Sequence, residues 1–207
     1  MSPSQVADQP AVWRGHSPLE SLGEGVHVAV LYADERERNA HLIPYLVAAS
    51  LAGKESICVA ADEPDDLSSL LENRSPGSSA ALVVLPTDET YLRDGRFASD
   101  EMAAWLGDMA QDAPLGTTHP ATRVAGDIDW LDRFAGDSLA ELHAYESRLD
   151  GFASSCRHTF ACFYSRATLP AAGIIDVFKT HSKVLVGGVL WDSPFYEGAS
   201  AARSGHE

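Results

Sequence analysis

Two cysteines and two histidines near the carboxyl end of the chain are residue types that bind zinc. Cys156, His158 and Cys162 have the same parity, so a continuous strand would point all three to one face, with His181 available from the next helix. Two thiolates and two imidazoles satisfy zinc. However, the C-x-H-x₃-C spacing matches no known finger or ribbon, and Cys156 is expected at the end of the preceding helix. We therefore favour buried structural cysteines and expect no metal.

Cys162 and His181 also have the types needed for a nucleophile with its base, or for a redox sensor. Either role requires a partly exposed thiol with a lowered pKa, which the sequence does not reveal. We favour ligand contact for both residues. The chain contains no G-x-S-x-G, H-E-x-x-H or G-x-G-x-x-G motif. We therefore expect a protein that is not an enzyme, with no catalytic residue and no cofactor.

The stretch "LYADERERNAHLIPYLVAASLAGKESICVAADE" has the outline of a phosphate-binding strand, turn and helix. A phosphate-binding loop needs glycine amides, a lysine and a Ser or Thr, in the pattern G-x-x-x-x-G-K-[ST]. At the four diagnostic positions this chain has Ala33, Arg38, Asn39 and Ala40. Asp34 and Glu35 instead place negative charge where an anion would bind. We therefore do not expect ATP to bind here in the usual way.

The elements that must position these residues alternate between short β-rich runs and stretches of helical periodicity. The expected strands are residues 27–32, 57–61, 81–85, 122–126, 158–164 and 183–190. The clearest expected helices are residues 35–52, 99–111 and 171–181. This alternation predicts an α/β fold with three layers, in which helices flank a mostly parallel sheet.

Ligands of open α/β sheets bind at the carboxyl ends of the strands. That edge is expected to carry aromatic and charged residues: Tyr32, Asp34, Asp62, Glu63, the "TDETYLRDGRF" loop, residues 127–130 and residues 164–166. Arg93 and Arg96 are expected either to pair with acids such as Asp94, Glu89 or Glu146 or to clamp a carboxylate. A buried salt bridge with Glu146 is one option for Arg123, which is not expected to be catalytic.

The composition restricts the class of protein. A net charge of -15 would repel a nucleic-acid backbone, so direct nucleic-acid binding is not expected. No apolar run approaches the roughly 20 residues of a membrane span, and the amino end lacks a secretion signal. Three cysteines, an odd number, indicate reduced thiols. We expect a cytoplasmic protein with a flexible arm over residues 1–24, one domain over residues 25–196 and a disordered tail over residues 197–207.

The collected segments resemble one known family, the MEDS domain, named for methanogens, methylotrophs and the dichloromethane-responsive repressor. The matching pieces run from about Gly25 to Tyr196: "HVAVLY" before an acidic turn, "LAGKESICVAADE", "TDETYLRDGRF", "TRVAGDIDWL", "AYESRL", "CFY" and "VFKTHSKVLVGG". The loop residues of "YLRDGRF" and the pair "YE" carry most of the specificity. Cys162 and His181 match residues of the family pattern.

The resemblance implies a RecA-like core with a degenerate P-loop, in which Asp127 takes the place of the Mg²⁺-binding acid. It also implies a sensor of small molecules, with simple hydrocarbon derivatives as ligands. Such domains commonly adjoin a helix-turn-helix or a histidine kinase, and the flanks of this chain are too short for either. We therefore expect signal transduction or transcription regulation through a partner protein: a transcription factor, a kinase or an anti-sigma component.

We expect one ligand pocket at the carboxyl edge of the sheet. Its predicted residues are Tyr32, Tyr91, Arg93, Phe97, Arg123, Trp130, Cys162, Tyr164 and His181. The ligand must favour one arrangement of the "TDETYLRDGRF" loop or of a homodimer surface, since a ligand that binds two states equally shifts neither. Two alternatives stay open: a RecA-like enzyme that acts on a nucleotide or phosphate through an unusual site, and a pure protein-interaction module.

Overall fold

The protein is built on one central sheet. The computed structural model describes residues 16–60, 64–93, 96–116, 118, 121–133 and 138–198. Its seven-stranded sheet has the order β3-β2-β6-β7-β1-β8-β9, and every pair is parallel except β8 with β9. The strands are β1 (His27–Tyr32), β2 (Ser56–Ala60), β3 (Leu82–Pro86), β6 (Arg123–Asp127), β7 (Thr159–Ser165), β8 (Lys183–Val186) and β9 (Val189–Asp192).

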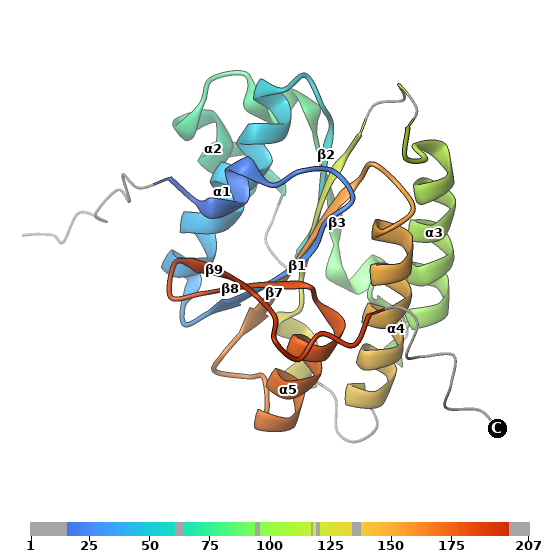
Figure 1. The fold of residues 1–207 in the computed structure, drawn as a ribbon. Helices are drawn as coiled ribbons and strands as arrows, with labels where there is room; N and C mark the ends of the chain where they lie inside the picture. Colours follow the sequence, from blue (N-terminus) through green and yellow to red (C-terminus); the bar gives the residue numbers. More distant parts are fainter. Residues whose placement is uncertain are drawn as a thin grey trace, which may run out of the picture.

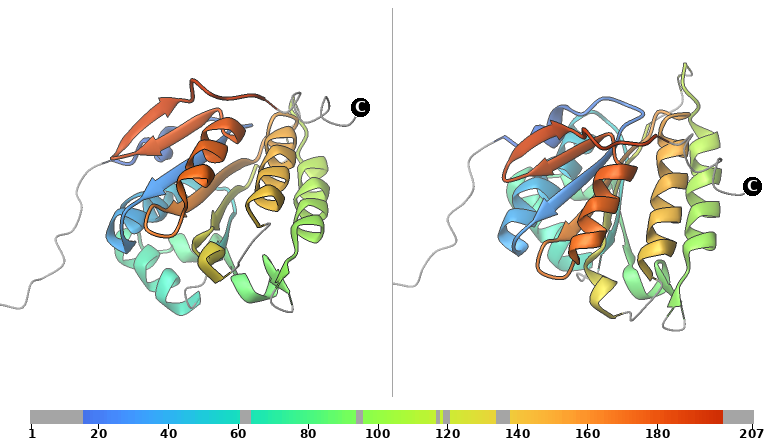
Figure 2. Two further views of the ribbon diagram at one scale, coloured as in Figure 1. Left: turned by 90° about the horizontal axis from the view of Figure 1, so that it is seen from below. Right: turned by 60° about the horizontal axis from the view of Figure 1, so that its bottom comes forward.

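Helices cover both faces of this sheet (Figure 1). One face is covered by α1 (Glu35–Leu51) and α2 (Pro64–Arg74). The other is covered by α3 (Ser99–Asp112), α4 (Ser138–Ala153) and α5 (Ala171–Thr180), as Figure 2 shows from two further directions. Short 3-10 turns lie at Pro18–Ser21, Ser78–Ala81, Thr87–Glu89 and Asp129–Arg133. The predicted three-layer α/β fold is therefore confirmed.

The two central strands explain why the layers form. All six residues of β1 and all seven of β7 are buried, because both strands have helices on both faces. Alternate residues of β1 face opposite layers: Ala29 and Leu31 pack towards α3, α4 and α5, whereas Val28 and Val30 pack towards α1 and α2. A continuous apolar run is typical of such a strand, and the predicted bounds of β1 agree with the structure.

The prediction of one strand over residues 183–190 is wrong. This segment forms two antiparallel strands, β8 and β9, with Val186 paired to Val189. The turn between them consists of Gly187 and Gly188, whose φ angles are 57° and 76°. Two successive residues with positive φ make a tight hairpin turn that glycine adopts at low cost.

The amino-terminal segment from Ser17 onwards also differs from the expected flexible arm. A 3-10 turn at Pro18–Ser21 is closed by a reciprocal capping box between Ser17 and Glu20. Leu19 is fully buried against α1. Residues 1–15 and 199–207, which carry the rest of the predicted arm and tail, lie outside the described residues.

Among the helices that the structure describes, none combines the length and apolar character required to cross a bilayer. Cys58, Cys156 and Cys162 are all buried, and none of them forms a disulfide. The expectation of reduced thiols is therefore consistent with the structure.

A second, minor sheet lies beyond the carboxyl end of β3. Its strands β4 (Leu92–Arg93) and β5 (Arg96–Phe97) pair in antiparallel fashion, within the segment that the sequence predicts to be a ligand loop. The amide of Ala98 donates a hydrogen bond to the carbonyl of Tyr91 at 2.7 Å and closes this segment at its base. The segment thereby presents Tyr91 and Phe97 to the core.

Candidate functional site

The turn between β1 and α1 is filled by the chain's own carboxylates. The amide of Ala33 donates to Glu37 Oε2 at 2.7 Å, and the amide of Glu37 donates to Asp34 Oδ1 at 2.8 Å. In a phosphate-binding loop the amides of this turn would donate to phosphate oxygens. Asp34 and Glu37 also line an open cavity of about 370 Å³ beside this turn, next to Gly187 and Gly188. Arg36 and His41 line the same cavity, so the occupied turn amides, rather than the charge of the cavity, disfavour a phosphate here.

A buried ion pair occupies the region where a metal-bound nucleotide would be held. Arg38 Nη1 lies 2.6 Å from Asp127 Oδ2, and the hydroxyl of Tyr32 donates to Asp127 Oδ1 at 3.0 Å. Burial raises the pKa of Asp127 to about 6 even though Arg38 opposes this shift, so Asp127 is charged and paired at neutral pH. Both carboxylate oxygens are thus used by protein groups, and Asp127 cannot serve Mg²⁺ in the usual way.

Four aromatic rings meet on the α3–α4 face of the sheet. Tyr91 and Phe97 come from the β4–β5 segment, Trp130 follows β6 and Tyr145 comes from α4, and all four are buried. The ring centroids of Phe97 and Trp130 are 4.8 Å apart, and those of Tyr91 and Trp130 are 5.5 Å apart. Tyr145 meets Phe97 edge to face at 5.5 Å. We call these four residues the aromatic cluster.

The aromatic cluster packs tightly against the sheet at Gly126. A methyl group at this position would lie 2.2 Å from the Tyr91 hydroxyl oxygen, so only glycine leaves room for Tyr91. Beside this contact is a small void of about 10 Å³, whose lining includes Gly126, Tyr91, Tyr145 and Cys162. The cluster therefore borders Cys162 across a space that is only partly filled.

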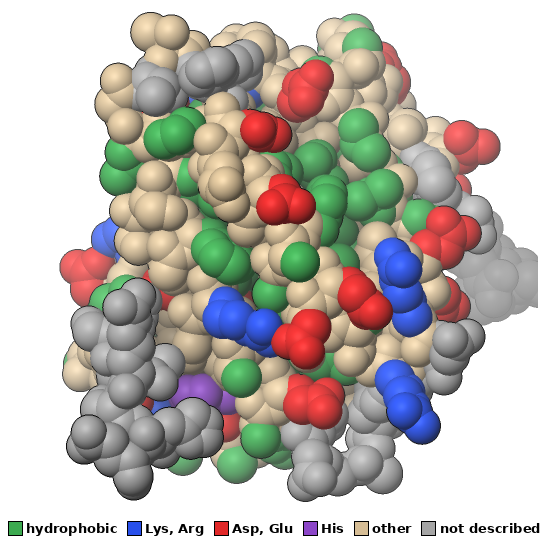
Figure 3. Space-filling view, turned by 90° about the vertical axis from the view of Figure 1, so that its right-hand side faces the viewer, with side chains coloured by type: hydrophobic (Ala, Val, Ile, Leu, Met, Phe, Trp, Pro, Cys, Tyr) green, Lys and Arg blue, Asp and Glu red, His purple; other side chains and the backbone are tan. Residues whose placement is uncertain are grey.

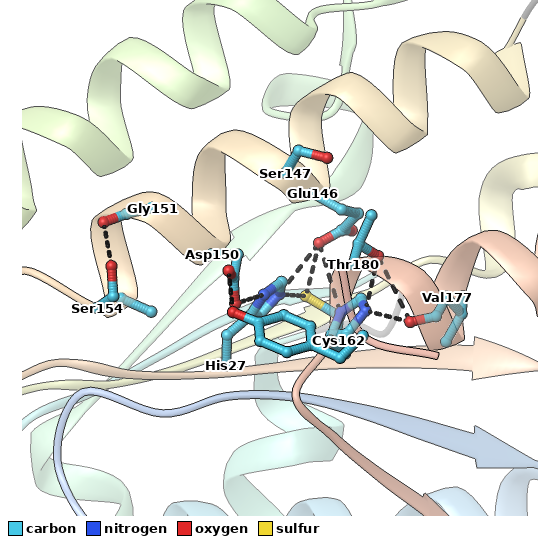
Figure 4. A network of polar contacts seen from close by, with 12 residues as sticks. His27, Glu146, Ser147, Asp150, Gly151, Ser154, Cys162, Val177 and Thr180 are labelled. Carbon is cyan, nitrogen blue, oxygen red and sulfur yellow. Dashed lines mark hydrogen bonds and ion pairs between the residues drawn. The ribbon is translucent and has the colours of Figure 1, made fainter. Parts of the chain in front are cut away.

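A second group of polar side chains lies on the same face of the sheet, between β1, β7, α4 and α5 (Figure 4). His27 from β1, Glu146 from α4, Cys162 from β7 and His181 after α5 bring their nitrogen, oxygen and sulfur atoms within 4.8 Å of one another. We call these four residues the polar cluster. All four are buried. They lie towards the amino ends of β1 and β8, away from the carboxyl edge where the sequence places Cys162 and His181.

Hydrogen bonds around the polar cluster fix its orientation. Tyr164 donates its hydroxyl to Glu146 Oε1 at 2.6 Å, and Tyr196 donates to Asp150 Oδ2 at 2.6 Å. The Nδ1 atom of His181 lies 2.9 Å from the carbonyl oxygen of Val177. These partners leave Glu146 Oε2 and His181 Nε2 directed at the centre of the cluster, 3.6 Å apart.

Burial sets the protonation states of the polar cluster. Burial and, to a smaller extent, the neighbouring His27 lower the pKa of His181 to about 3, so His181 is neutral. Burial alone would lower the pKa of His27, but contact with the Asp150 and Glu146 carboxylates holds that pKa above its ordinary value. Burial, aided by Glu146, raises the pKa of the Cys162 thiol well above its ordinary value.

The structure divides the predicted pocket residues among several places. The aromatic cluster contains Tyr91, Phe97 and Trp130, whereas Cys162, His181 and Tyr164 belong to the polar cluster or contact it. Tyr32 packs towards α1 and bonds Asp127. Arg93 is exposed on β4. Their roles in ligand binding stay predictions.

Arg123 lies apart from all of these residues. It stands at the amino end of β6, where its guanidinium donates to the carbonyl oxygens of Leu19, Glu20 and Tyr45. The option of a salt bridge between Arg123 and Glu146 is therefore wrong. The physical reason is that Arg123 is directed to the α1 face, where it ties the amino-terminal segment to the core, whereas Glu146 lies on the opposite face.

The zinc set considered from the sequence does not assemble. Cys156 lies beyond α4, as expected, and His158 precedes β7. The two nitrogens of His158 are engaged by the amide of Thr122 at 2.9 Å and the carbonyl of Met109 at 2.8 Å. Of the four residues considered, only Cys162 and His181 come together.

Sequence reasoning did not select Glu146, Asp150, Tyr145 or Arg38 for the site. Glu146 and Asp150 are four residues apart on α4 and share its buried face with Leu142 and Leu149. The sequence signal for Glu146 and Asp150 is the presence of two acids on the apolar face of a predicted helix. Such acids are expected to be buried, and a buried carboxylate needs a partner. The predicted edge residues Asp62 and Glu63, and the loop residues Asp94 and Gly95, lie outside the described residues.

Comparison with solved structures supports the α/β fold described above. The crystal structure of the RadB recombinase matches with a TM-score of 0.51 and 13% sequence identity, over 78% of this chain and 74% of that chain. This likeness shows the fold alone. A search of curated proteins finds no match.

The fold and the filled turn define the class of protein: a RecA-like α/β domain with a degenerate phosphate-binding site. The family model for MEDS, the methanogen/methylotroph, DcmR sensory domain, matches residues 26–182. The chain belongs to the MEDS family of sensory domains.

Proposed function

We propose that this protein senses a small, largely apolar molecule, such as a simple hydrocarbon derivative, at the aromatic cluster. The observation that carries the proposal is the contact of four buried aromatic rings, Tyr91, Phe97, Trp130 and Tyr145, two of which, Tyr91 and Tyr145, border a void that is only partly filled. Buried aromatic rings with a few polar groups are typical of sites for such ligands. The hydroxyls of Tyr91 and Tyr145 and the thiol of Cys162 would contact the polar end of the ligand.

The void of about 10 Å³ is smaller than the ligand, so binding must move side chains. We infer that Tyr91 and Phe97 move, because they lie on the short β4 and β5 strands, whereas Trp130 and Tyr145 are fully buried between larger elements. A ligand that occupies the space vacated by Tyr91 and Phe97 would favour a second arrangement of β4 and β5. Such differential binding is what allows a sensor to respond.

We propose binding rather than catalysis as the activity of this chain. A cysteine nucleophile needs a lowered pKa and access to solvent. Cys162 is buried, and its pKa is raised by burial and by Glu146. The alternative of a nucleotide-acting enzyme is disfavoured by the carboxylates and the Arg38–Asp127 ion pair that fill the phosphate region.

The signal is proposed to pass, in the cytoplasm, to a regulatory protein partner rather than directly to nucleic acid. The surface formed by α3 and α4 shows acidic, basic and hydrophobic side chains together (Figure 3), and the chain as a whole has a net charge of -15. A net negative charge of this size repels the phosphate groups of nucleic acid. At the edge of the sheet, Trp191 and Phe195 are 55% and 65% exposed, which supports contact with another protein or with a second copy.

The test is a ligand panel measured by melting temperature and by tryptophan fluorescence. Short-chain alcohols, amines and chloroalkanes are added separately to the full chain. The expected result is that at least one class raises the melting temperature in a saturable way and changes the emission of Trp130, which lies in the aromatic cluster.

Two tryptophan variants give the control. Trp130→Phe removes the buried reporter, whereas Trp191→Phe removes an exposed one on β9. The fluorescence response should fall in Trp130→Phe, with the remainder arising from Trp105, which lines the void, and it should be kept in full in Trp191→Phe. A panel in which no compound stabilises the wild-type chain would favour a pure interaction module instead.

A further inference from the structure

Two ring nitrogens in the polar cluster have no hydrogen-bond partner among the described residues: His27 Nδ1 and His181 Nε2. The nitrogen of His181 is the one that faces the centre of the cluster. His181 Nδ1 is 2.9 Å from the carbonyl oxygen of Val177, which can only accept, so this nitrogen carries the proton of the neutral ring. His181 Nε2 therefore presents a lone pair to the interior. It is fully buried and unsatisfied, and the nearest acidic atom, Glu146 Oε2, is also an acceptor at 3.6 Å. Glu146 Oε2 already faces His27 Nε2 at 3.1 Å and accepts from the Cys162 thiol at 3.5 Å, so His181 Nε2 is the acceptor left without a donor. A buried acceptor with no donor indicates a missing cation or donor.

The remaining atoms of the polar cluster point at the same centre. His27 Nε2 lies 3.1 Å from Glu146 Oε2. Cys162 Sγ lies 3.5 Å from His27 Nε2 and 3.5 Å from Glu146 Oε2. Figure 4 shows His27, Glu146 and Cys162 turned towards one another from three different elements. Two imidazoles, one thiolate and one carboxylate form a mixed nitrogen, sulfur and oxygen donor set that suits zinc.

The spacing of these atoms fits the edges of a metal-centred tetrahedron. Zinc bond lengths give edges of about 3.4 Å between nitrogen and oxygen, and about 3.6 Å between sulfur and either atom. Four of the six edges are 3.1, 3.5, 3.5 and 3.6 Å, and the two edges that join His181 Nε2 to His27 and to Cys162 are at most 4.8 Å. His27, Glu146 and Cys162 are therefore already at metal-binding spacing, and His181 has to move towards them by no more than about 1 Å to surround an ion with them.

A second layer of contacts orients the donors in the manner common at metal sites. His27 Nδ1 faces Asp150 Oδ1 at 3.6 Å, and the other Asp150 oxygen accepts from Tyr196. His181 is oriented by the Val177 carbonyl, and Glu146 by the Tyr164 hydroxyl. Each of the metal-binding side chains except Cys162 thus has a neighbouring residue that fixes the orientation of its donor atom.

We propose that His27, Glu146, Cys162 and His181 form a buried binding site for a divalent zinc ion. This proposal departs from the sequence-based expectation of no metal. Four protein donors leave no open position, so the site is of the closed kind that holds elements together rather than the catalytic kind. It would join β1, β7, α4 and the start of β8 on the face that also carries the aromatic cluster. The two proposed sites share Cys162, whose sulfur would bind the ion while its side chain borders the aromatic cluster, and the zinc titration tests the metal without any organic ligand.

A solvent-open cavity lies one side chain away from the polar cluster. A cavity of about 80 Å³ opens beside the polar cluster and is lined by Asp150, Thr180 and Lys179. Asp150 lies both in this lining and against His27. An ion that enters the cavity would meet the Asp150 carboxylate first and then the ring of His27.

The direct test uses the reduced full chain, freed of metal with a chelator and then titrated with ZnCl₂ or CoCl₂. The expected result is one tightly bound ion per chain and a higher melting temperature with zinc. With cobalt we expect the visible bands of a tetrahedral ion and a near-ultraviolet thiolate-to-cobalt band. X-ray absorption at the zinc edge should show one sulfur neighbour, with nitrogen or oxygen as the others.

Matched variants assign the donors. Cys162→Ser should remove the thiolate band, whereas Cys156→Ser, which changes a buried thiol outside the polar cluster, should keep it. His181→Gln should weaken cobalt binding strongly. Asp150→Asn changes a partner of a ligand and should weaken binding by about 10- to 100-fold.

Three results would overturn the proposal: no bound zinc or cobalt in the reduced wild-type chain, a cobalt spectrum without a thiolate band, or loss of that band in Cys156→Ser. If Cys162→Ser does not fold, the wild-type titration and the sulfur neighbour in X-ray absorption decide the outcome without it.

Discussion

Arg38 and Asp127 are joined by a buried ion pair, with Arg38 Nη1 2.6 Å from Asp127 Oδ2. Arg38 stands on the first turns of α1, and Asp127 ends β6. The pair lies beneath the turn whose amides are already bound by Glu37 and Asp34. A chain of RecA-like fold thus satisfies with its own side chains the groups that could otherwise hold a metal-bound phosphate.

Removal of Arg38 should destabilise the fold strongly. Arg38→Met leaves the Asp127 carboxylate buried without its cation, and we expect a loss of about 3–5 kcal/mol in the free energy of unfolding. Denaturation with urea measures this loss. Arg38→Met combined with Asp127→Asn removes both charges and should cost less than the sum of the single variants. Additive losses would mean that the two residues are not coupled.

Mg-ATP should not stabilise the wild-type chain. The amides of the turn already donate to carboxylates, and Asp127 is already paired. Differential scanning fluorimetry with and without Mg-ATP, checked by calorimetry and with an intact P-loop ATPase as positive control, measures the effect. A saturable rise in melting temperature accompanied by binding heat would contradict this prediction.

Gly126→Ala should disturb the aromatic cluster. The new methyl group would lie 2.2 Å from the Tyr91 hydroxyl oxygen, so Tyr91 must move. We expect a loss of about 1–3 kcal/mol in the free energy of unfolding and a changed emission of Trp130. Gly23→Ala is the control, because nothing lies within 4 Å of its added carbon. Tyr91→Phe should partly rescue Gly126→Ala, and an equal loss with and without the hydroxyl would refute the proposed clash.

Glu24 should make stability depend on pH in the acid range. Hydrogen bonds from Arg157 and Lys54 lower its pKa from 4.5 to about 2. Because the folded state holds the ionised form, the stabilising contribution is fully present above pH 4.5 and is lost as pH falls through about 2.

The measurement for Glu24 compares the unfolding free energies of wild type and Glu24→Gln across this range. The difference should be modest, since the pair is partly exposed, and it should shrink as pH falls from 4.5 towards 2. Glu101→Gln, at an exposed acid of α3, is the control and should show no such trend. A difference between wild type and Glu24→Gln that is constant with pH would contradict the assignment.

Much of the fold follows from the sequence alone. Apolar runs predict the buried strands, and the bounds of β1 agree fully. Acidic residues after β1 predict a turn that rejects phosphate, and Asp34 does cap α1. The hairpin of β8 and β9 was missed because periodicity does not register two adjacent glycines with positive φ. Local sequence patterns therefore predict most helices and strands, but they do not predict every tight turn, such as the one between β8 and β9.

The candidate sites depend on tertiary structure. Cys162 and His27 are far apart in the chain and meet because β7 pairs with β1 in parallel, with Ala29 opposite Cys162. No local pattern specifies that strand order, since it arises from how the helices cover the two faces. The sequence by itself determined which side chains are present for chemistry, that the phosphate-binding motif is absent, and to which family the chain belongs. Only the packing of α4 and α5 against β1 and β7 decided that Glu146 and His181 share one buried centre.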